Sequence, residues 1–280
     1  MTKQALCQYS DALDFEGARG ALRIWLPTQL GYINYNLTHT VKESIHADIW
    51  RLGQAYAADD ARANEYALTP AGAEWDMAIR IAGRDDFIGG YAHGDEIFSS
   101  LSLWLDGQPT EVTSLSEPTP FRELRIREDS VGYDPADHTT AVLLHQKDYR
   151  IDRDGITLSQ RVEWLSDHTL GPAYLAMMPP MKTWTDTYFT DVDESPAPLT
   201  GESFSVAGCR RAVFYSTSNG CLRFEMSVPR YPSLAGGDTF LMTDNGGKRY
   251  HKMYFMLCKN TDVRRGDVWE TETVYRISNG

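Results

Sequence analysis

The stretch TTAVLLHQKDYRIDRDGITLSQRVEWL, residues 139–165, contains two runs in which apolar and polar residues alternate. The runs 139–152 and 155–165 are rich in Val, Ile, Leu, Thr and Tyr, and β-branched and aromatic side chains pack well on a pleated surface. They are joined by Asp152-Arg153-Asp154-Gly155, and Asp and Gly are residues that tight turns use. This stretch therefore predicts a β-hairpin.

The same period-two pattern recurs along most of the chain. The best candidate for a helix is only the short segment 56–66, and DESPAPLTGES, residues 193–203, is expected to be a long loop. Strands without intervening helices form antiparallel sheets that must stack or close to bury their apolar faces. We therefore expect an all-β fold, a large antiparallel β-sandwich of the supersandwich or jelly-roll type, with residues 1–280 in a single domain. The further predicted strands are residues 21–27, 32–41, 45–53, 74–83, 97–107, 173–179, 209–218, 221–228, 252–258 and 269–277.

The composition indicates a globular chain with no nucleic-acid or membrane partner. Its 280 residues, 42% of them hydrophobic, are enough to bury a sizeable core. The formal charge of -12 argues against a phosphate backbone as partner, because that binding relies on clustered Lys and Arg. No signal peptide or membrane span is visible, so we expect a cytoplasmic protein. The four cysteines lack CxxC spacing, and we expect no cofactor.

The segment FIGGYAHGDEIF, residues 87–98, places polar side chains between stretches that resemble core strands. In a strand, Tyr91, His93 and Asp95 would share one face and Glu96 would point the other way. We predict that His93 is catalytic and that the other three contact a substrate. The alternative is a hairpin or bulge in which His93 makes a local hydrogen bond.

A second cluster lies in the first strand of the hairpin. By the same alternation His145, Lys147 and Tyr149 share a face, where a core-facing strand would carry apolar residues. A solvated strand end is one explanation. We favour a concave, ligand-lined sheet surface, because His and Tyr can exchange protons in a suitable environment and Lys supplies positive charge. All three are predicted catalytic residues.

A third group lies in MPPMKTWTDTY, residues 178–188, where two prolines exclude a regular central strand. The segment should form a shaped loop in which Lys182, Trp184 and Tyr188 contact substrate, and a Trp beside charged residues could form one wall of a sugar subsite. Equally, Trp184 could serve only to attach the loop to the core.

A many-stranded sandwich with His, Tyr and Lys on a sheet face and Trp on nearby loops resembles the carbohydrate-active β-sandwiches, namely polysaccharide lyases and galactose-mutarotase-like supersandwich proteins. In such lyases a base removes the proton beside a uronate carboxyl group while a cation stabilises the developing enolate. The resemblance implies β-elimination on an acidic oligo- or polysaccharide, with His93 or His145 as base, Lys147 or Lys182 as the cation, and Tyr149 or Tyr91 as the acid.

Other functions stay open at this point. A glycosidase would pair Asp95 or Glu96 with a second carboxylate, such as Asp186 or Glu225. A mutarotase-like epimerase would need one acid and one base. A non-catalytic sugar-binding sandwich would need only aromatic platforms.

A metal site is not expected, although His93 and Glu96 could be two ligands if the fold brought His145 to them. The sequence does not determine the sugar, the linkage or the oligomeric state. Nor does it establish that the segments 91–96 and 145–149 meet in space.

Overall fold

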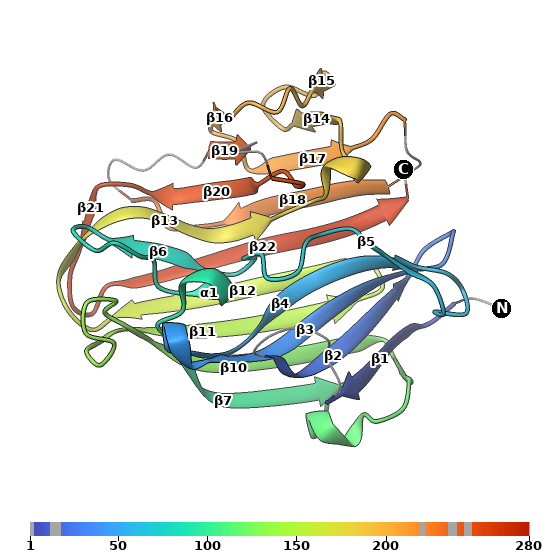
Figure 1. The fold of residues 1–280 in the computed structure, drawn as a ribbon, viewed down its shortest axis with the longest axis horizontal. Coiled ribbons are helices and arrows are strands. Elements are labelled where there is room, and N and C mark those ends of the chain that lie inside the picture. Colours follow the sequence, from blue (N-terminus) through green and yellow to red (C-terminus); the bar gives the residue numbers. More distant parts are fainter. Residues whose placement is uncertain (1–2, 12–17, 219–221, 235–239, 244–247, 280) are drawn as a thin grey trace.

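The computed structural model describes residues 3–11, 18–218, 222–234, 240–243 and 248–279. Within these ranges the chain forms a sixteen-stranded sheet and a six-stranded sheet, which pack face to face (Figure 1). The pairing is antiparallel except between two strands of the large sheet, β4 and β7. The predicted all-β, largely antiparallel sandwich is therefore confirmed.

The large sheet runs through most of the chain. Two short strands lie off its main path, β5 (Glu65–Ala67) beside β4 and β8 (Gln108–Pro109) beside β7. The strand order on the main path is β15 (Ala197–Pro198), β14 (Thr187–Thr190), β17 (Arg211–Tyr215), β18 (Leu222–Arg230), β22 (Val268–Asn279), β12 (Gly155–Trp164), β11 (Ala141–Asp152), β10 (Glu123–Tyr133), β7 (Glu96–Leu105), β4 (Ala47–Ala58), β3 (Tyr32–Lys42), β2 (Ala18–Pro27), β1 (Ala5–Ser10) and β9 (Thr119–Phe121).

The small sheet covers part of the inner face of the large one. Its strands, in order, are β16 (Phe204–Ala207), β19 (Phe240–Thr243), β20 (Met253–Cys258), β13 (His168–Met178) and β21 (Thr261–Val263), with β6 (Ala78–Ile81) beside β13. The described helical segments are one turn each, namely α1 (Gly90–His93) and the 3-10 turns η1 (Glu43–Ile45), η2 (Val112–Ser114) and η3 (Lys182–Trp184). None of the described helices is long and apolar enough to cross a membrane.

The main core lies between the two sheets. Tyr149, Phe224 and Tyr275 of the large sheet pack in one cluster with Met178 and Phe255 of the small sheet. The segment that leads from β5 to β6 also enters this interior, since the Trp75 carbonyl accepts hydrogen bonds from the Tyr275 hydroxyl (2.8 Å) and the Met177 amide (3.1 Å). That segment covers the inner face of the central strands, where the polar residues of β11 lie.

The hairpin predicted from residues 139–165 is confirmed. β11 and β12 pair from Leu143 opposite Trp164 to Asp152 opposite Gly155. Gly155 has a φ of +145°, and a Cβ there would lie 2.5 Å from the Tyr275 carbonyl oxygen, so this turn requires glycine.

Two expectations about the elements were wrong. Residues 56–66 do not form a helix, because β4 extends to Ala58 and β5 begins at Glu65. Strand β10 was not predicted, although it lies at the centre of the large sheet between β7 and β11. Its inward positions after Ile126 are Glu128 and Ser130, both buried, so the apolar half of the period-two pattern is interrupted where the strand is most enclosed.

Candidate active site

Glu96 and His145 meet inside the sandwich, so the segments 91–96 and 145–149 do come together. His145 Nδ1 lies 2.9 Å from Glu96 Oε1, and its Nε2 lies 3.0 Å from Gln160 Oε1. The Ser130 hydroxyl donates to the same Glu96 oxygen at 2.7 Å. Strand β10 lies between β7 and β11, so its small Ser130 leaves room for the two longer side chains to reach each other above it.

Lys147 is the centre of this buried network. Its Nζ lies 2.7 Å from Glu128 Oε2, donates to the Trp50 carbonyl at 2.7 Å, and lies 3.9 Å from carboxylate oxygens of Glu96 and Asp76. Burial alone would lower the pKa of Lys147, but the charges of Glu128, Glu96 and Asp76 outweigh burial and raise it. The ammonium therefore stays charged and holds the carboxylates together.

The pKa values of Glu96 and Glu128, two carboxylates beside Lys147, are shifted in opposite directions. Burial raises the pKa of Glu128 to about 7 despite the adjacent ammonium. Burial also acts to raise the pKa of Glu96, but the charge of Lys147 and the hydrogen bond from His145 together leave it well below the usual range. Burial also raises the pKa of Asp76, the third carboxylate that faces Lys147. Within this coupled network Glu96 is the carboxylate held most firmly in its ionised form.

Tyr149 completes the network by donating a hydrogen bond from its hydroxyl to Asp76 Oδ2 at 2.7 Å. His145, Lys147 and Tyr149 are each at most 1% exposed. The expected open, ligand-lined sheet face is therefore not what the structure has, because the segment that carries Asp76 covers it. A catalytic role for these three side chains would require that cover to open, and their position here is that of a buried ionic network.

The expectation that Tyr91, His93 and Asp95 share the face of a strand was wrong. Residues Gly90–His93 form α1, and Gly89, Gly90 and Gly94 all have positive φ, which bends the chain sharply before and after this turn. As a result Glu96 points into the core while His93 reaches the surface, where its side chain is 28% exposed.

His93 lies between two carboxylates. Its Nδ1 is 2.5 Å from Asp86 Oδ1, and its Nε2 is 3.9 Å from Glu74 Oε1. That Glu74 oxygen is buried and has no hydrogen-bond partner among the described residues. The Asp86 carboxylate accepts a hydrogen bond from Nδ1, and the other ring nitrogen, Nε2, faces Glu74. We call His93, Glu74 and Asp86 the His93 cluster.

Aromatic rings and cations surround the His93 cluster. The Phe87 ring lies 4.9 Å from the His93 ring and 6.4 Å from that of Tyr174, centroid to centroid. The Tyr91 ring has the Lys42 ammonium at 4.6 Å and the Arg51 guanidinium at 4.7 Å. Tyr91, predicted to contact substrate, is therefore a half-buried packing partner of two cations beside this cluster.

Asp95 lies apart from the His93 cluster. Its carboxylate is 2.6 Å from His138 Nδ1 and 3.4 Å from His46 Nδ1. Neither histidine was singled out from the sequence, because each is isolated in a loop and carries no spacing motif. Only the folded chain brings these three residues together.

The third predicted group serves mainly to hold its own loop. Trp184 packs against the core and donates from its indole nitrogen to the Ala67 carbonyl at 2.9 Å, which is the anchoring role considered above. Tyr188 stacks near Phe204, at 4.8 Å between ring centroids. Lys182 lies in η3, and its charge contributes to lowering the pKa of the buried His251.

The carboxylates considered for a glycosidase are held by neighbouring groups. Asp186 accepts hydrogen bonds from the Thr217 amide (3.0 Å) and the Ser216 hydroxyl (2.8 Å). Burial acts to raise its pKa, but these hydrogen bonds lower it well below the usual range. Glu225 is paired with Arg211 at 2.9 Å and Arg276 at 3.3 Å. Asp186 and Glu225 therefore bond to groups other than Asp95 and Glu96, and the described residues do not assemble the expected glycosidase pair.

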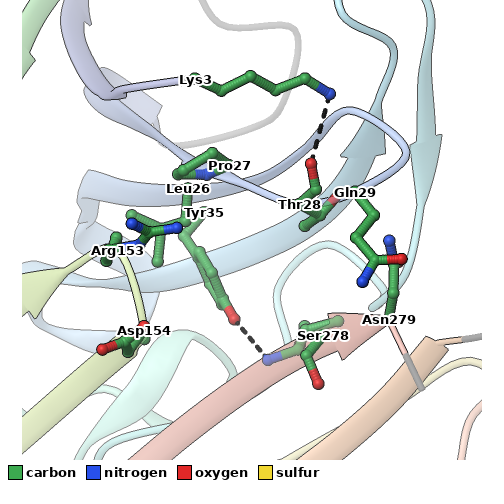
Figure 2. A pocket seen from close by; sticks show the side chains of 12 residues that line it. Lys3, Leu26, Pro27, Thr28, Gln29, Tyr35, Arg153, Asp154, Ser278 and Asn279 are labelled. Atoms are coloured by element: carbon green, nitrogen blue, oxygen red, sulfur yellow. Dashed lines mark hydrogen bonds between the residues drawn. The ribbon is translucent and has the colours of Figure 1, made fainter. Parts of the chain in front are cut away.

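Two larger cavities are open to solvent, and none of the ten predicted site residues lines either. One, of about 630 Å³, lies between the β2–β3 turn, the β11–β12 turn and the end of β22 (Figure 2). In Figure 2 the Tyr35 hydroxyl accepts a hydrogen bond from the β22 backbone at 3.1 Å, and Lys3 donates to the Thr28 carbonyl at 3.3 Å.

The other cavity is a groove of about 740 Å³ on the outer face of β10, β11, β12 and β22. We call it the outer groove. Charged pairs across neighbouring strands line it, including Arg150 with Glu123 at 2.6 Å and the pair of Arg125 with Asp148. Trp104, on the adjacent strand β7, lies under the Arg125 guanidinium at 5.5 Å.

Neither a family model nor a curated protein sequence matches this chain. Solved structures do resemble it. They include a 4-alpha-glucanotransferase from Thermococcus litoralis (TM-score 0.45, 8% identity), which covers 99% of this chain while the chain spans 40% of that protein.

Two smaller proteins align over nearly their whole length. A protein assigned as an aldose 1-epimerase from Escherichia coli K12 has a TM-score of 0.46 and 12% identity over 91% of this chain and 99% of its own. A galactose mutarotase-like protein from Clostridium acetobutylicum has a TM-score of 0.45 and 8% identity over 98% and 99%. At TM-scores below 0.5, these similarities do not define what this chain binds or converts.

Proposed function

We propose that the protein is a sugar-processing enzyme that interconverts ring forms of an aldose by acid–base catalysis at the His93 cluster. The observation that carries the proposal is the geometry of His93, a partly exposed imidazole with a carboxylate at each ring nitrogen, 2.5 Å and 3.9 Å away. The reaction is of the mutarotase or aldose-epimerase type.

The required chemistry needs one proton donor and one proton acceptor side by side. In a cyclic aldose, the ring oxygen and the anomeric hydroxyl are bonded to the same carbon. His93, held by Asp86 and protonated, would donate its Nε2 proton to the ring oxygen while the Glu74 carboxylate accepts the anomeric hydroxyl proton. The carbon–ring oxygen bond then breaks to give the open-chain aldehyde. Rotation and closure on the other face return both protons.

Two features of the cluster suit these roles. The Glu74 Oε1 atom is buried and has no hydrogen-bond partner among the described residues, so it is a ready acceptor aimed toward His93. The Asp86 carboxylate lies at Nδ1 and fixes the orientation of the imidazole, which leaves Nε2 to face Glu74. The half-buried ring of Phe87 lies next to the imidazole and that of Tyr174 lies beside Phe87, and aromatic faces of this kind can pack against the apolar face of a sugar.

The test is polarimetry of freshly dissolved α-aldoses, with glucose, galactose and glucuronate as a panel. We expect the wild-type protein to accelerate the approach to the anomeric equilibrium. His93→Gln and Glu74→Gln should each lower this rate about a hundredfold or more, the usual contribution of a general acid or base. His39→Gln is the matched control, because His39 is also paired with a carboxylate, Asp48 at 2.7 Å, outside the cluster.

Two further assays separate the competing reactions. An absorbance rise near 235 nm on acidic polysaccharides, lost in His93→Gln, would replace the proposed reaction by β-elimination. Release of reducing ends without that absorbance would indicate hydrolysis. Equal polarimetric rates in wild type, His93→Gln and buffer would exclude the His93 cluster as a mutarotase site.

A second candidate function is sugar binding without turnover in the outer groove. It is favoured by the groove volume of about 740 Å³, which is large enough for a sugar, and by the nearby pair of Trp104 and Arg125. It predicts that oligosaccharides quench Trp fluorescence in wild type and in His93→Gln alike, and that Trp104→Ala abolishes the response.

A further inference from the structure

We infer that His46, Asp95 and His138 form a binding site for a divalent first-row transition ion, with zinc as the reference case. One ligand atom from each of these residues can be chosen so that all three lie within 4.8 Å of one another. Among the described residues, it is the group of three or more His, Cys, Asp or Glu side chains whose ligand atoms lie this close together. We call it the His–Asp–His site.

Three separate segments of the chain build the site. His46 follows η1 at the turn between β3 and β4, Asp95 lies between α1 and β7, and His138 lies in the loop between β10 and β11. The pairing of Ala47 with Glu96, which begins the parallel contact of β4 with β7, sets the two preceding residues side by side.

The backbone around the site is held independently of any ion. The Asp95 amide donates to the Ile45 carbonyl at 2.9 Å, and the Asp95 carbonyl accepts from the Tyr133 amide at 2.8 Å. The His138 amide donates to the Asp134 carbonyl at 2.8 Å. These bonds connect all three segments, so the ligands are placed before an ion binds.

The backbone of all three ligands is strained. His46, Asp95 and His138 have φ values of 51°, 52° and 57°, and they are three of the six non-glycine residues with positive φ in the described part of the chain. Side chains other than glycine rarely adopt this region, and such residues concentrate at binding and catalytic sites. Three loops that are distant in the sequence therefore each place a residue with an unfavourable positive φ at the same site.

The spacing of the ligand atoms fits a small cation. Asp95 Oδ1 lies 2.6 Å from His138 Nδ1 and 3.4 Å from His46 Nδ1. An ion with bonds of about 2.0–2.2 Å keeps its ligand atoms roughly 3–3.5 Å apart, a separation close to those found here, since all three ligand atoms lie within 4.8 Å of one another.

The burial of the Asp95 carboxylate gives an electrostatic reason for a cation to bind here. The Asp95 side chain is 3% exposed, whereas His46 and His138 are 35% and 55% exposed. The Nδ1 atom of His46 is buried and has no hydrogen-bond partner among the described residues. A buried carboxylate thus faces two imidazoles, one with an unused nitrogen, at a position that an ion could enter from the solvent side.

The donor set selects the class of metal. Two imidazole nitrogens and one carboxylate oxygen suit Zn²⁺, Fe²⁺ or Co²⁺, whereas Mg²⁺ and Ca²⁺ prefer all-oxygen sets. Three protein ligands leave at least one position for water or another ligand.

The experiment is a titration of the chelator-treated full-length protein with Zn²⁺ by calorimetry and with Co²⁺ by visible absorption. We expect one equivalent of Zn²⁺ to bind, a Co²⁺ spectrum with d–d bands that report low coordination number, and a rise in melting temperature with Zn²⁺. His46→Ala and His138→Ala should each weaken binding by more than about a hundredfold, since the removal of supporting residues alone costs tenfold to a hundredfold.

His39→Ala is the matched control, because His39 pairs with one carboxylate and has no second imidazole, and its affinity for Zn²⁺ should equal that of wild type. Both ligand variants change partly exposed residues, and circular dichroism would verify that they remain folded. The inference is overturned if wild type binds no Zn²⁺, which would leave a plain ion pair of His138 with Asp95. It is overturned equally if His46→Ala and His138→Ala bind Zn²⁺ as wild type does.

Discussion

Lys147 Nζ lies 2.7 Å from the Glu128 carboxylate in the interior of the sandwich, with both side chains at most 1% exposed. Buried pairs of this kind are weak evidence for added stability, yet they are costly to break, because the remaining partner stays buried without compensation. Glu96 and Asp76 also face Lys147 at 3.9 Å, so its loss would leave three buried carboxylates without their common cation.

Lys147→Met should therefore lower the free energy of unfolding by about 3–5 kcal/mol, measured by urea denaturation at pH 7. The matched control is Arg125→Met, which removes a pair with Asp148 in which the Arg125 side chain is 50% exposed, and it should cost about 1 kcal/mol or less. If both variants unfold at the same urea concentration while Lys147→Met loses its activity on a sugar, Lys147 is catalytic rather than structural.

Position 94, the residue after α1, requires glycine because the chain there packs closely against Ile45, in the turn that precedes β4. Its φ is +82°, and a Cβ there would lie 1.8 Å from the Ile45 carbonyl oxygen. Gly94→Ala should be destabilising by at least roughly 3 kcal/mol, because backbone strain adds to the clash. Gly107 also has a φ of +82° but nothing within 4 Å of the added Cβ, so Gly107→Ala introduces no clash and should cost only about 1 kcal/mol.

Thermal or urea unfolding of the two glycine variants checks this prediction. Equal losses in both would mean that the close approach of Gly94 to Ile45 carries no energetic weight. A larger loss in Gly94→Ala would show that the two segments which supply His46 and Asp95 are held together at this contact.

His251 should make the protein less stable in mild acid. Burial, assisted by the charge of Lys182, lowers its pKa from 6.5 to about 4. Between these values the unfolded chain binds more protons than the folded one, so the free energy of unfolding falls as the pH falls from about 6.5 toward 4. The loss from this group should be about 2 kcal/mol between pH 7.5 and 4.5.

The measurement is urea unfolding of wild type and His251→Gln at pH 7.5, 5.5 and 4.5. The glutamine variant should show a shallower decline over this range, because the neutral amide does not titrate. Parallel declines in the two proteins would assign the acid sensitivity to other groups.

Trp184→Phe tests whether this residue anchors its loop or binds sugar. The phenyl ring keeps most of the packing but loses the hydrogen bond to the Ala67 carbonyl, so the free energy of unfolding should fall by about 1 kcal/mol. The proposed mutarotase reaction and sugar binding, measured by polarimetry and fluorescence, should be unchanged. A tenfold weaker sugar affinity at unaltered stability would instead place Trp184 in a subsite, as the sequence predicted.

Period-two patterning was sufficient to predict the sheets but not every strand. The hairpin at residues 139–165 was correct because the inward positions on both sides of its turn are apolar, namely Tyr149, Ile151, Ile156 and Leu158, all fully buried. The polar inward residues His145 and Lys147 lie further from the turn. Strand β10 was missed because Glu128 and Ser130 occupy its buried positions, and a buried Glu is stable only through partners on other strands.

The candidate site was predicted in its residue types and not in its arrangement. Glu96 and His145 do meet, which the sequence left open, but the glycines around α1 turn His93 away from the buried network toward the surface. Alternation in a strand cannot reveal such a turn. Glu74, Asp86, His46 and His138 were missed altogether, since none of them lies in a recognisable motif or in one of the three polar clusters that the sequence singled out.

What the sequence determined by itself is the class of fold, because side-chain alternation is a local property that records which face of each strand is buried. It also identified the segments 87–98 and 143–151 as unusually polar for a core. What only the tertiary structure decided is which polar side chains share a site. His93 with Glu74, and Asp95 with His46 and His138, are brought together by turns and by strand pairings between distant segments, and these contacts depend on the whole folded chain.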